Sequence, residues 1–271
     1  MDLLNHSFPF SKTALNGKHA LIFGASKGIG AATGKMMAMA GADVTLCARN
    51  SESLKQVKNE IEKLASGRIS FRNVDLEELS SIDEIIDEIT TNLGPVHILV
   101  NNSGGPPGGP LLKNTVEDFD APFTRHLHAA HKITQRLVPL MESEGYGRII
   151  QIISTSVKEP IPNLGLSNTL RGAMASWSKS LSRELHPCIT INNVLPGFTD
   201  TERLGSLANS INQKTGKPID EIHDGWMSQV PIQRLVDPLE TASAITFLAL
   251  PSSGAIRGVS LAVDGGRLRG I

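Results

Sequence analysis

A glycine-rich turn near the N-terminus constrains the fold of this chain more than any other feature. Residues 20–23 form an apolar run with the length of a buried strand, and the alanine-rich residues 29–40 have the composition of a helix. Between them, Gly24 permits a tight exit from the strand, Gly28 permits close approach of a ligand, and Gly30 permits helix-on-strand packing. Free N–H groups and the positive end of the helix dipole favour a pyrophosphate there. We predict a phosphate-binding turn, with an ordinary strand-to-helix loop as the alternative.

Short apolar strands alternate with amphipathic helices along the chain. In residues 80–92, for example, isoleucines recur with helical spacing on one face. The predicted strands are residues 20–23, 43–48, 69–74, 96–100, 147–154 and 189–195, and the predicted helices are residues 29–40, 51–65, 80–92, 115–141 and 167–185. This alternation requires right-handed crossovers and a parallel sheet. We therefore predict an α/β fold with a doubly wound parallel sheet and helices on both faces.

Composition narrows the class of protein. A chain of 271 residues with 40% hydrophobic content can bury one large core, so we expect an N-terminal extension at residues 1–16 and a single domain over residues 17–271. The formal net charge of −1 offers no basic field for nucleic acid. Neither a membrane span nor a signal peptide is recognisable, and we predict a cytoplasmic protein. Cys47 and Cys188 lack metal-ligand spacing, so we expect buried thiols and no metal site.

The glycine spacing Gly-x-x-x-Gly-x-Gly resembles that of the short-chain dehydrogenase/reductase family, and matching motifs extend from Gly17 to Gly266. The resemblance implies one Rossmann-like domain that binds NAD(P). It also implies an oxidoreductase that acts on the carbonyl/alcohol pair of a small molecule and resembles ketoacyl reductases. Residues 200–230 occupy the place of the family's substrate lid, and we expect a mobile polar segment there.

Two cations indicate which nucleotide is preferred. Arg49 follows the second strand, where NAD-binding folds often carry an acidic residue, and Lys27 lies in the glycine turn. Both cations can meet a 2′-phosphate, as the resemblance also implies, so we expect NADP(H) to be favoured over NAD(H). The alternative for Arg49 is a solvated surface side chain.

Motifs after later strands complete the cofactor site that the resemblance implies. Asp75 and Leu76 match the pair that holds the adenine, and residues 101–104 resemble Asn-Asn-Ala-Gly, although they also suit a plain turn. Pro196, Gly197 and Thr201 resemble the loop that contacts the nicotinamide end. The full set expected to bind the cofactor is Gly24, Ser26, Lys27, Gly28, Ile29, Gly30, Arg49, Asp75, Leu76, Asn101, Ser103, Gly104, Arg171, Pro196, Gly197 and Thr201.

The catalytic positions depart from the family. Ser154 ends a strand where the family places the serine that polarises the carbonyl, but the family's Tyr and Lys positions hold Ser167 and Arg171. A serine hydroxyl is far less acidic than a tyrosine whose pKa a nearby ammonium lowers, so Ser167 cannot replace it alone. Arg171 can hold ribose hydroxyls and stabilise an alkoxide as a fixed cation. The only tyrosine, Tyr146, begins the strand that ends at Ser154 and is expected at its opposite end.

The family's remaining catalytic position, an asparagine, falls on His126. With an ordinary pKa of about 6.5, His126 is a candidate proton relay, and a solvated or locally bonded histidine is the alternative. We expect catalysis to involve Ser154, Arg171, His126 and Ser167. A cofactor-binding pseudoenzyme, serving as a sensor or a non-catalytic subunit, remains the alternative function. The helices over residues 115–141 and 167–185 are expected to form a homodimer or homotetramer interface, as in the family.

Overall fold

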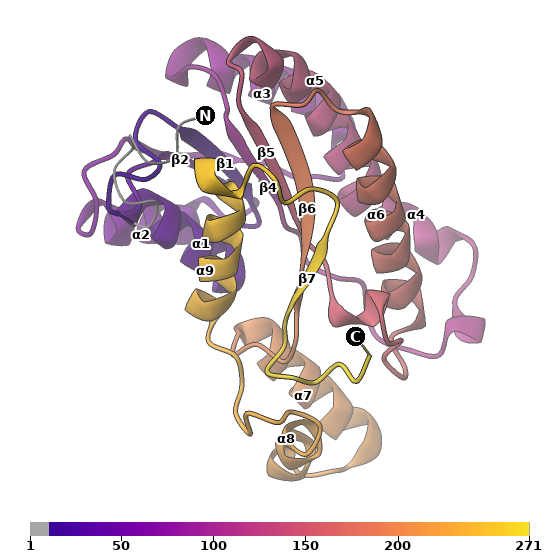
Figure 1. Cartoon of the computed structure of the whole chain (residues 1–271). Coiled ribbons are helices and arrows are strands. Elements are labelled where there is room, and N and C mark those ends of the chain that lie inside the picture. The colour runs from indigo at the N-terminus through magenta and orange to yellow at the C-terminus, as the bar shows by residue number, and fades with distance from the viewer. Residues whose placement is uncertain (1–10, 271) are drawn as a thin grey trace.

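The computed structural model describes residues 11–270, and its centre is a single parallel sheet (Figure 1). The strand order is β3-β2-β1-β4-β5-β6-β7, and each neighbouring pair is parallel. The strands are β1 (His19–Phe23), β2 (Asp43–Ala48), β3 (Ile69–Asn73), β4 (Ile98–Asn101), β5 (Gly147–Ile152), β6 (Ile189–Pro196) and β7 (Ser260–Val263). The chain adds strands on one side of β1 up to β3 and then on the other side from β4 onward, so the switch point where ligands of such sheets bind lies between β1 and β4.

Helices cover both faces of the sheet. In Figure 1, α1, α2 and α9 lie on one face, α3, α5 and α6 lie on the other, and α7 and α8 lie beyond the end of the sheet. The helices are α1 (Gly28–Met39), α2 (Ser51–Glu62), α3 (Leu79–Leu93), α4 (Asp120–Phe123), α5 (Ala129–Ser143), α6 (Gly165–Glu184), α7 (Glu202–Thr215), α8 (Ile219–Met227) and α9 (Pro238–Ala249). The predicted single-domain, doubly wound α/β fold is therefore confirmed.

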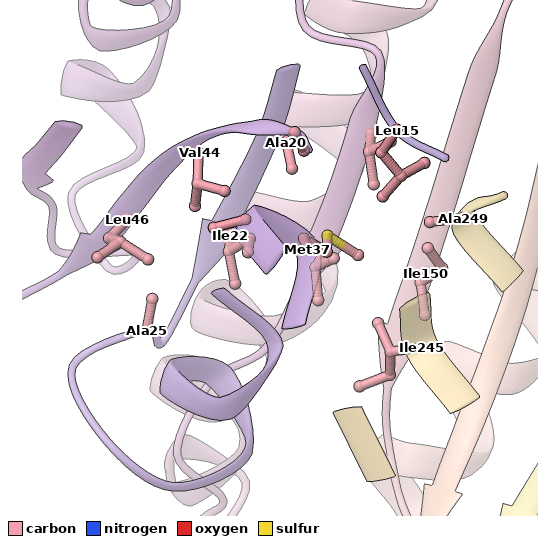
Figure 2. Packing of buried hydrophobic residues seen from close by; sticks show 14 of the residues in the cluster. Leu15, Ala20, Ile22, Ala25, Met37, Val44, Leu46, Ile150, Ile245 and Ala249 are labelled. Atoms are coloured by element: carbon pink, nitrogen blue, oxygen red, sulfur yellow. The ribbon is translucent and has the colours of Figure 1, made fainter. Parts of the chain in front are cut away.

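The core forms because the central strands bury side chains on both faces. All five residues of β1 are buried, and the largest apolar cluster joins β1, β2 and β5 to α1 and α9. Figure 2 shows Ile22, Met37, Ile150 and Ile245 of this cluster. Each such side chain stabilises the fold by about 1.5–3 kcal/mol on burial. This rigid centre holds the loops at the strand ends in place.

The segment before β1 differs from the expected extension. Leu15 is completely buried and belongs to the main cluster (Figure 2). Its backbone N–H donates to the carbonyl oxygen of Ala40. The last residues of the supposed extension therefore belong to the domain, because Leu15 fills space next to α1. Residues 1–10 lie outside the described residues.

The long helix predicted over residues 115–141 begins later in the structure. The carboxylate of Asp118 accepts hydrogen bonds from the Thr115 backbone N–H and from the Asn114 side chain, which makes a turn of this segment. A 3₁₀ turn (Glu117–Phe119), α4, a π-helical turn (Thr124–His128) and α5 then follow without a break. π-helical turns occur frequently at functional sites.

The structure also bears on the two cysteines and on membrane-spanning helices. Cys47 is buried as predicted, whereas Cys188 is only partly buried, with its Sγ 3.0 Å from Nδ1 of His186. Over residues 11–270, no helix combines the length and the apolar character that a membrane crossing requires.

Candidate active site

A deep cleft of about 1250 Å³ lies at the carboxyl ends of the strands. The glycine turn after β1 and the loop after β2 form one end, and the loop after β5 and the start of α6 contribute to the other. Of the residues predicted from sequence, those in the cleft wall are Gly24, Ser26, Lys27, Gly28, Ile29, Arg49, Asp75, Leu76, Ser103, Gly104, Ser154, Ser167, Arg171, Pro196, Gly197 and Thr201. The remaining three, Gly30, Asn101 and His126, lie outside it.

The glycine turn has the shape that a phosphate-binding loop requires. Gly24 and Gly28 have φ of 60° and 55°, a left-handed conformation that other residues rarely adopt. Helix α1 begins at Gly28, and its N-cap residue Lys27 makes no capping bond with its side chain. The first turn of α1 also carries no acidic residue. Its N–H groups and positive dipole end are therefore left for a ligand anion, and the turn fits a dinucleotide diphosphate.

Gly30 supports the turn from behind the cleft wall. A β-carbon at this position would lie 2.3 Å from the carbonyl oxygen of Gly24, so α1 can approach the turn only with glycine there. The Asn102 side chain donates to the same carbonyl oxygen at 3.2 Å and thereby ties the loop after β4 to the turn.

Asn101, which the sequence predicts to bind the cofactor, does not line the cleft. Asn101 is the last residue of β4, and it lines a small cavity behind the cleft, whereas Asn102 lines both. Successive side chains of an extended chain point to opposite faces, which explains why adjacent asparagines have different surroundings. The sequence motif contains both residues, so spacing alone could not distinguish them.

Positive charge marks the glycine-turn end of the cleft. The Arg49 side chain is 65% exposed, and its Nη1 lies 4.0 Å from the Asp75 carboxylate. Lys27 forms a closer ion pair with Glu202, at 2.6 Å between Nζ and Oε2. Both pairs are exposed, so water and salt screen them and a phosphate can compete for either cation.

Ser154, Ser167 and Arg171 all line the cleft, and the last two lie close together. Ser154 follows β5, and its Oγ accepts a hydrogen bond of 3.1 Å from the Ser156 backbone N–H. Ser167 and Arg171 are four residues apart on α6, so both side chains lie on one face of the helix. A β-carbon on Gly105 would lie 3.5 Å from Nη2 of Arg171 and 3.9 Å from Oγ of Ser167, which places both groups at one point of the wall.

Arg171 is a buried cation without an acidic partner among residues 11–270. Its side chain donates to the Ile152 carbonyl oxygen at 3.1 Å, and only 8% of the residue is exposed. Burial, and to a smaller extent the charges of Arg203 and Arg125, together lower the pKa of Arg171 to about 10. The guanidinium is still protonated at neutral pH, and its desolvated charge can stabilise an oxyanion strongly.

His126 does not have the properties expected of a titrating relay. It is buried in the π-helical turn, where Nδ1 lies 2.6 Å from Ser103 Oγ and Nε2 lies 3.0 Å from the Gly104 carbonyl oxygen. Burial first, and then the positive charge of Arg171, lower the pKa of His126 to about 2. The assumed ordinary pKa is therefore wrong. A neutral imidazole donates to Gly104 and accepts from Ser103, so His126 positions the cofactor-side loop.

The segment of residues 200–230, expected to be mobile and polar, contains the two helices α7 and α8. Ala208 of α7 packs with Ile222 and Trp226 of α8 in an apolar cluster separate from the main core. The same segment contributes Arg203 to the cleft, and the C-terminal residues contribute Arg267. Sequence reasoning missed both arginines because no motif marked them and their approach depends on how α7 and the chain after β7 fold back.

Tyr146 lies away from the cleft wall, as predicted. It is buried beside the start of β5, and its hydroxyl donates to the Ala249 carbonyl oxygen. Burial raises the pKa of Tyr146 to about 12. Among residues 11–270, the cleft wall contains neither tyrosine nor histidine. No group of three or more His, Cys, Asp or Glu in this part of the chain is placed to hold a metal ion.

A doubly wound sheet with a glycine turn at its switch point and a cleft over the strand ends defines a dinucleotide-binding α/β protein. The comparisons with known proteins agree with this class. The short chain dehydrogenase family model matches residues 18–212, and the chain belongs to this family of oxidoreductases.

Similar proteins cover nearly the whole chain. The chain is 32% identical to a 3-oxoacyl-[acyl-carrier-protein] reductase of Vibrio cholerae, with 93% of this chain and 98% of that protein aligned. It is 28% identical to an NADPH-dependent reductase of Bacillus subtilis, with the same shares aligned. The crystal structure of L-sorbose reductase from Gluconobacter frateurii, complexed with NADPH and L-sorbose, superposes with a TM-score of 0.89 at 26% identity, covering 96% of this chain and 100% of that one.

Proposed function

We propose that the protein is an NADP(H)-dependent oxidoreductase that interconverts the carbonyl and alcohol forms of a small molecule with a non-standard catalytic pair. One observation carries the proposal: a single cleft is lined by a glycine turn flanked by cations, by the buried, unpaired guanidinium of Arg171 and by Ser154. The first end suits a phosphorylated dinucleotide and the second suits a carbonyl oxygen. NADPH-dependent relatives with similar sequence and structure support the cofactor assignment.

In this proposal, one set of residues binds the cofactor and another binds the carbonyl group. The glycine turn and the start of α1 hold the diphosphate, and Lys27 and Arg49 contact the 2′-phosphate. When bound, NADPH supplies a hydride to the carbonyl carbon. The Ser154 hydroxyl orients the carbonyl, and Arg171 stabilises the negative charge that develops on its oxygen.

The proton that completes the alcohol would come from solvent water in the cleft. Ser167 is no stronger an acid than water and lacks the reach of a tyrosine, so it has no advantage over a water molecule that exchanges its proton with bulk solvent. The proton also cannot come from an imidazolium at His126, which is neutral at working pH. Ser167 instead leaves room for water beside Arg171, because serine is smaller than the tyrosine of the resembling family.

Cofactor preference tests the first part of the proposal. NADPH should bind more tightly than NADH in a fluorescence titration, and Arg49→Ala should reduce that preference by about tenfold, as expected for loss of one charge-assisted contact. Lys55→Ala is a matched control, because Lys55 is an exposed cation on α2 outside the cleft wall. Equal affinities for the two nucleotides would contradict the assignment.

Turnover tests the second part. NADPH oxidation should be measured with ketones, aldehydes and an acetoacetyl thioester, beside a Ser167→Tyr/Arg171→Lys double variant. Activity of the wild-type protein that Arg171→Gln abolishes would support the proposed chemistry.

A non-catalytic, cofactor-sensing protein is the second candidate function. It is favoured by the absence of tyrosine and histidine from the described cleft wall. A silent wild-type protein beside an active double variant would favour this candidate.

We also propose a homodimer or homotetramer built on α4–α5 and α6, which lie on one face of the sheet (Figure 1). Trp177 of α6 donates to His131 of α5 at 3.2 Å, so the two helices present a joint surface that an isologous partner could cover. A monomer in light scattering at micromolar concentration would refute this assembly.

A further inference from the structure

The cleft carries far more positive charge than its own acidic residues balance. Its wall contains two acidic residues, Asp75 and Glu202, and seven basic ones, which are Lys27, Arg49, Arg125, Arg171, Arg203, Lys214 and Arg267. The whole chain, by contrast, has a formal net charge of −1. Such a concentration of one sign in a low-dielectric cleft attracts anions.

The cations at the catalytic end have no acidic partner. Glu202 pairs with Lys27, Asp75 lies nearest Arg49, and Arg125 pairs with Glu77 at 3.2 Å. For Arg171 and Arg203, no carboxylate of residues 11–270 approaches to within 4.0 Å of the guanidinium. The glycine turn, Lys27 and Arg49 already serve the phosphates of the proposed cofactor, so the unpaired arginines are left for another anion.

Arg203, from α7, lies close to Arg171, from α6. Nη2 of Arg203 lies 3.7 Å from the position of a β-carbon on Gly105, and Nη2 of Arg171 lies 3.5 Å from the same point. Two like charges this close destabilise each other, and the charge of Arg203 indeed lowers the pKa of Arg171. A bound anion between α7 and the residue 105–106 loop would relieve this repulsion.

The guanidinium of Arg203 is held in place and still has donors to offer. Nη2 donates to the carbonyl oxygens of Gly105 and Pro106 at 3.2 and 3.0 Å. An arginine has five N–H donors, and no protein acceptor among residues 11–270 uses those on Nε and Nη1. The residue is exposed, so these donors are accessible to a ligand in the cleft.

The wall next to these arginines is apolar. Phe198 and Trp226 both line the cleft and stack with ring centroids 5.3 Å apart. The guanidinium of Arg267 lies 5.2 Å from the Phe198 ring centroid and donates to Thr155 Oγ1 at 3.1 Å. This aromatic wall suits the apolar body of a small molecule.

We propose, on the basis of the reductase function proposed above, that the substrate is an oxo carboxylic acid with an apolar body, and that Arg203 binds its carboxylate. Arg171 then faces the carbonyl oxygen while Arg203 holds the acid group a short distance away. The aromatic wall of Phe198 and Trp226 holds the remainder. Arg203 is thus a specificity-determining residue.

The test compares oxo acids with their uncharged methyl esters. The probes are an α-oxo acid and a γ-oxo acid that each carry a phenyl group, assayed beside their esters for NADPH oxidation. A charge-assisted contact of about 1.5–3 kcal/mol predicts that kcat/KM for the better acid exceeds that of its ester by about 10- to 100-fold. An ester that is turned over as well as its acid would overturn the inference and leave the reductase function standing.

Variants locate the effect at Arg203. Arg203→Gln should bring the acid-to-ester ratio close to one, and Arg203→Lys should retain part of it. Arg183→Gln is the matched control, because Arg183 is exposed near the end of α6, about 18 Å along the helix axis from Arg171, and it should keep the ratio. If Arg203→Gln weakens NADPH binding without substrate as much as it weakens use of the acid, Arg203 serves the cofactor and the inference is wrong.

Calorimetry keeps the inference testable in the absence of turnover. The acid should bind the complex of wild-type protein with NADP⁺ at least about tenfold more tightly than its ester, and Arg203→Gln should remove that difference. Binding of the acid without turnover would support the anion site and refute the proposed activity. A phosphonate analogue that binds more tightly than the acid would overturn the assignment to a carboxylate.

Discussion

Replacement of His126 by glutamine tests the electrostatics of the site without any assumption about substrate. The His126 pKa is lowered from 6.5 to about 2 in the folded protein, chiefly by burial. The unfolded chain therefore binds a proton on this residue at a pH where the folded protein does not. The stabilising contribution is complete above the unfolded-state pKa of about 6.5 and declines as the pH falls from there towards about 2.

The expected magnitude follows from the linkage relation. Each pH unit below about 6.5 removes about 1.4 kcal/mol, so between about pH 8 and about pH 4.5 the wild-type protein should lose about 2.7 kcal/mol through His126 alone. The His126→Gln variant lacks this loss. The difference in unfolding free energy between wild type and variant should therefore shrink, and can change sign, as the pH falls.

Urea unfolding at a series of pH values, with one protein concentration and no nucleotide, measures this difference. His19 and His97 also have lowered pKa values, but they are present in both proteins and cancel in the comparison. His128→Gln is the matched control, because His128 is an exposed histidine of the same π-helical turn. A wild-type-minus-variant difference that stays constant within about 0.5 kcal/mol across this range would refute the buried, neutral imidazole.

Three further predictions concern the cleft and its support. Gly30→Ala should destabilise the protein by about 2 kcal/mol or more in urea unfolding, because its β-carbon would lie 2.3 Å from the Gly24 carbonyl oxygen. Gly172→Ala, in open space on α6, is the control and should stabilise the protein by about 0.5–1 kcal/mol. Equal effects of the two substitutions would contradict the close packing at Gly30. Ser167→Ala should cost little in kcat/KM while Arg171→Gln should cost about 10² to 10³, and loss of activity in Ser167→Ala would disprove water as the proton source. The rate of reduction should fall as the pH rises through about 10, because Arg171 loses its charge there. The pH profile should show no inflection near pH 6.5, because His126 is already neutral. A rate that is unchanged through pH 10 would contradict the role of Arg171.

Periodicity and spacing were enough to predict the strands from β1 to β6, the alternation of strands and helices in the first part of the chain, and the position of helix α6. β2 has the predicted bounds, and Ser167 and Arg171 lie on one face of α6, because the periods of strands and helices are local properties of the backbone. The glycine turn was equally readable, since only glycine suits its left-handed residues and close contacts. Such features depend on neighbours in the chain.

The ionisation of His126, the separate surroundings of Asn101 and Asn102, and the approach of Arg203 to Arg171 were decided by tertiary structure. Each depends on burial, on the face a side chain occupies, or on a contact between segments far apart in sequence. A pKa is set by the three-dimensional distribution of charge and solvent, which no spacing rule contains. The sequence alone therefore determined the fold, the glycine turn and the residues at the family's catalytic positions, and tertiary structure alone decided which cations face the cleft without a partner.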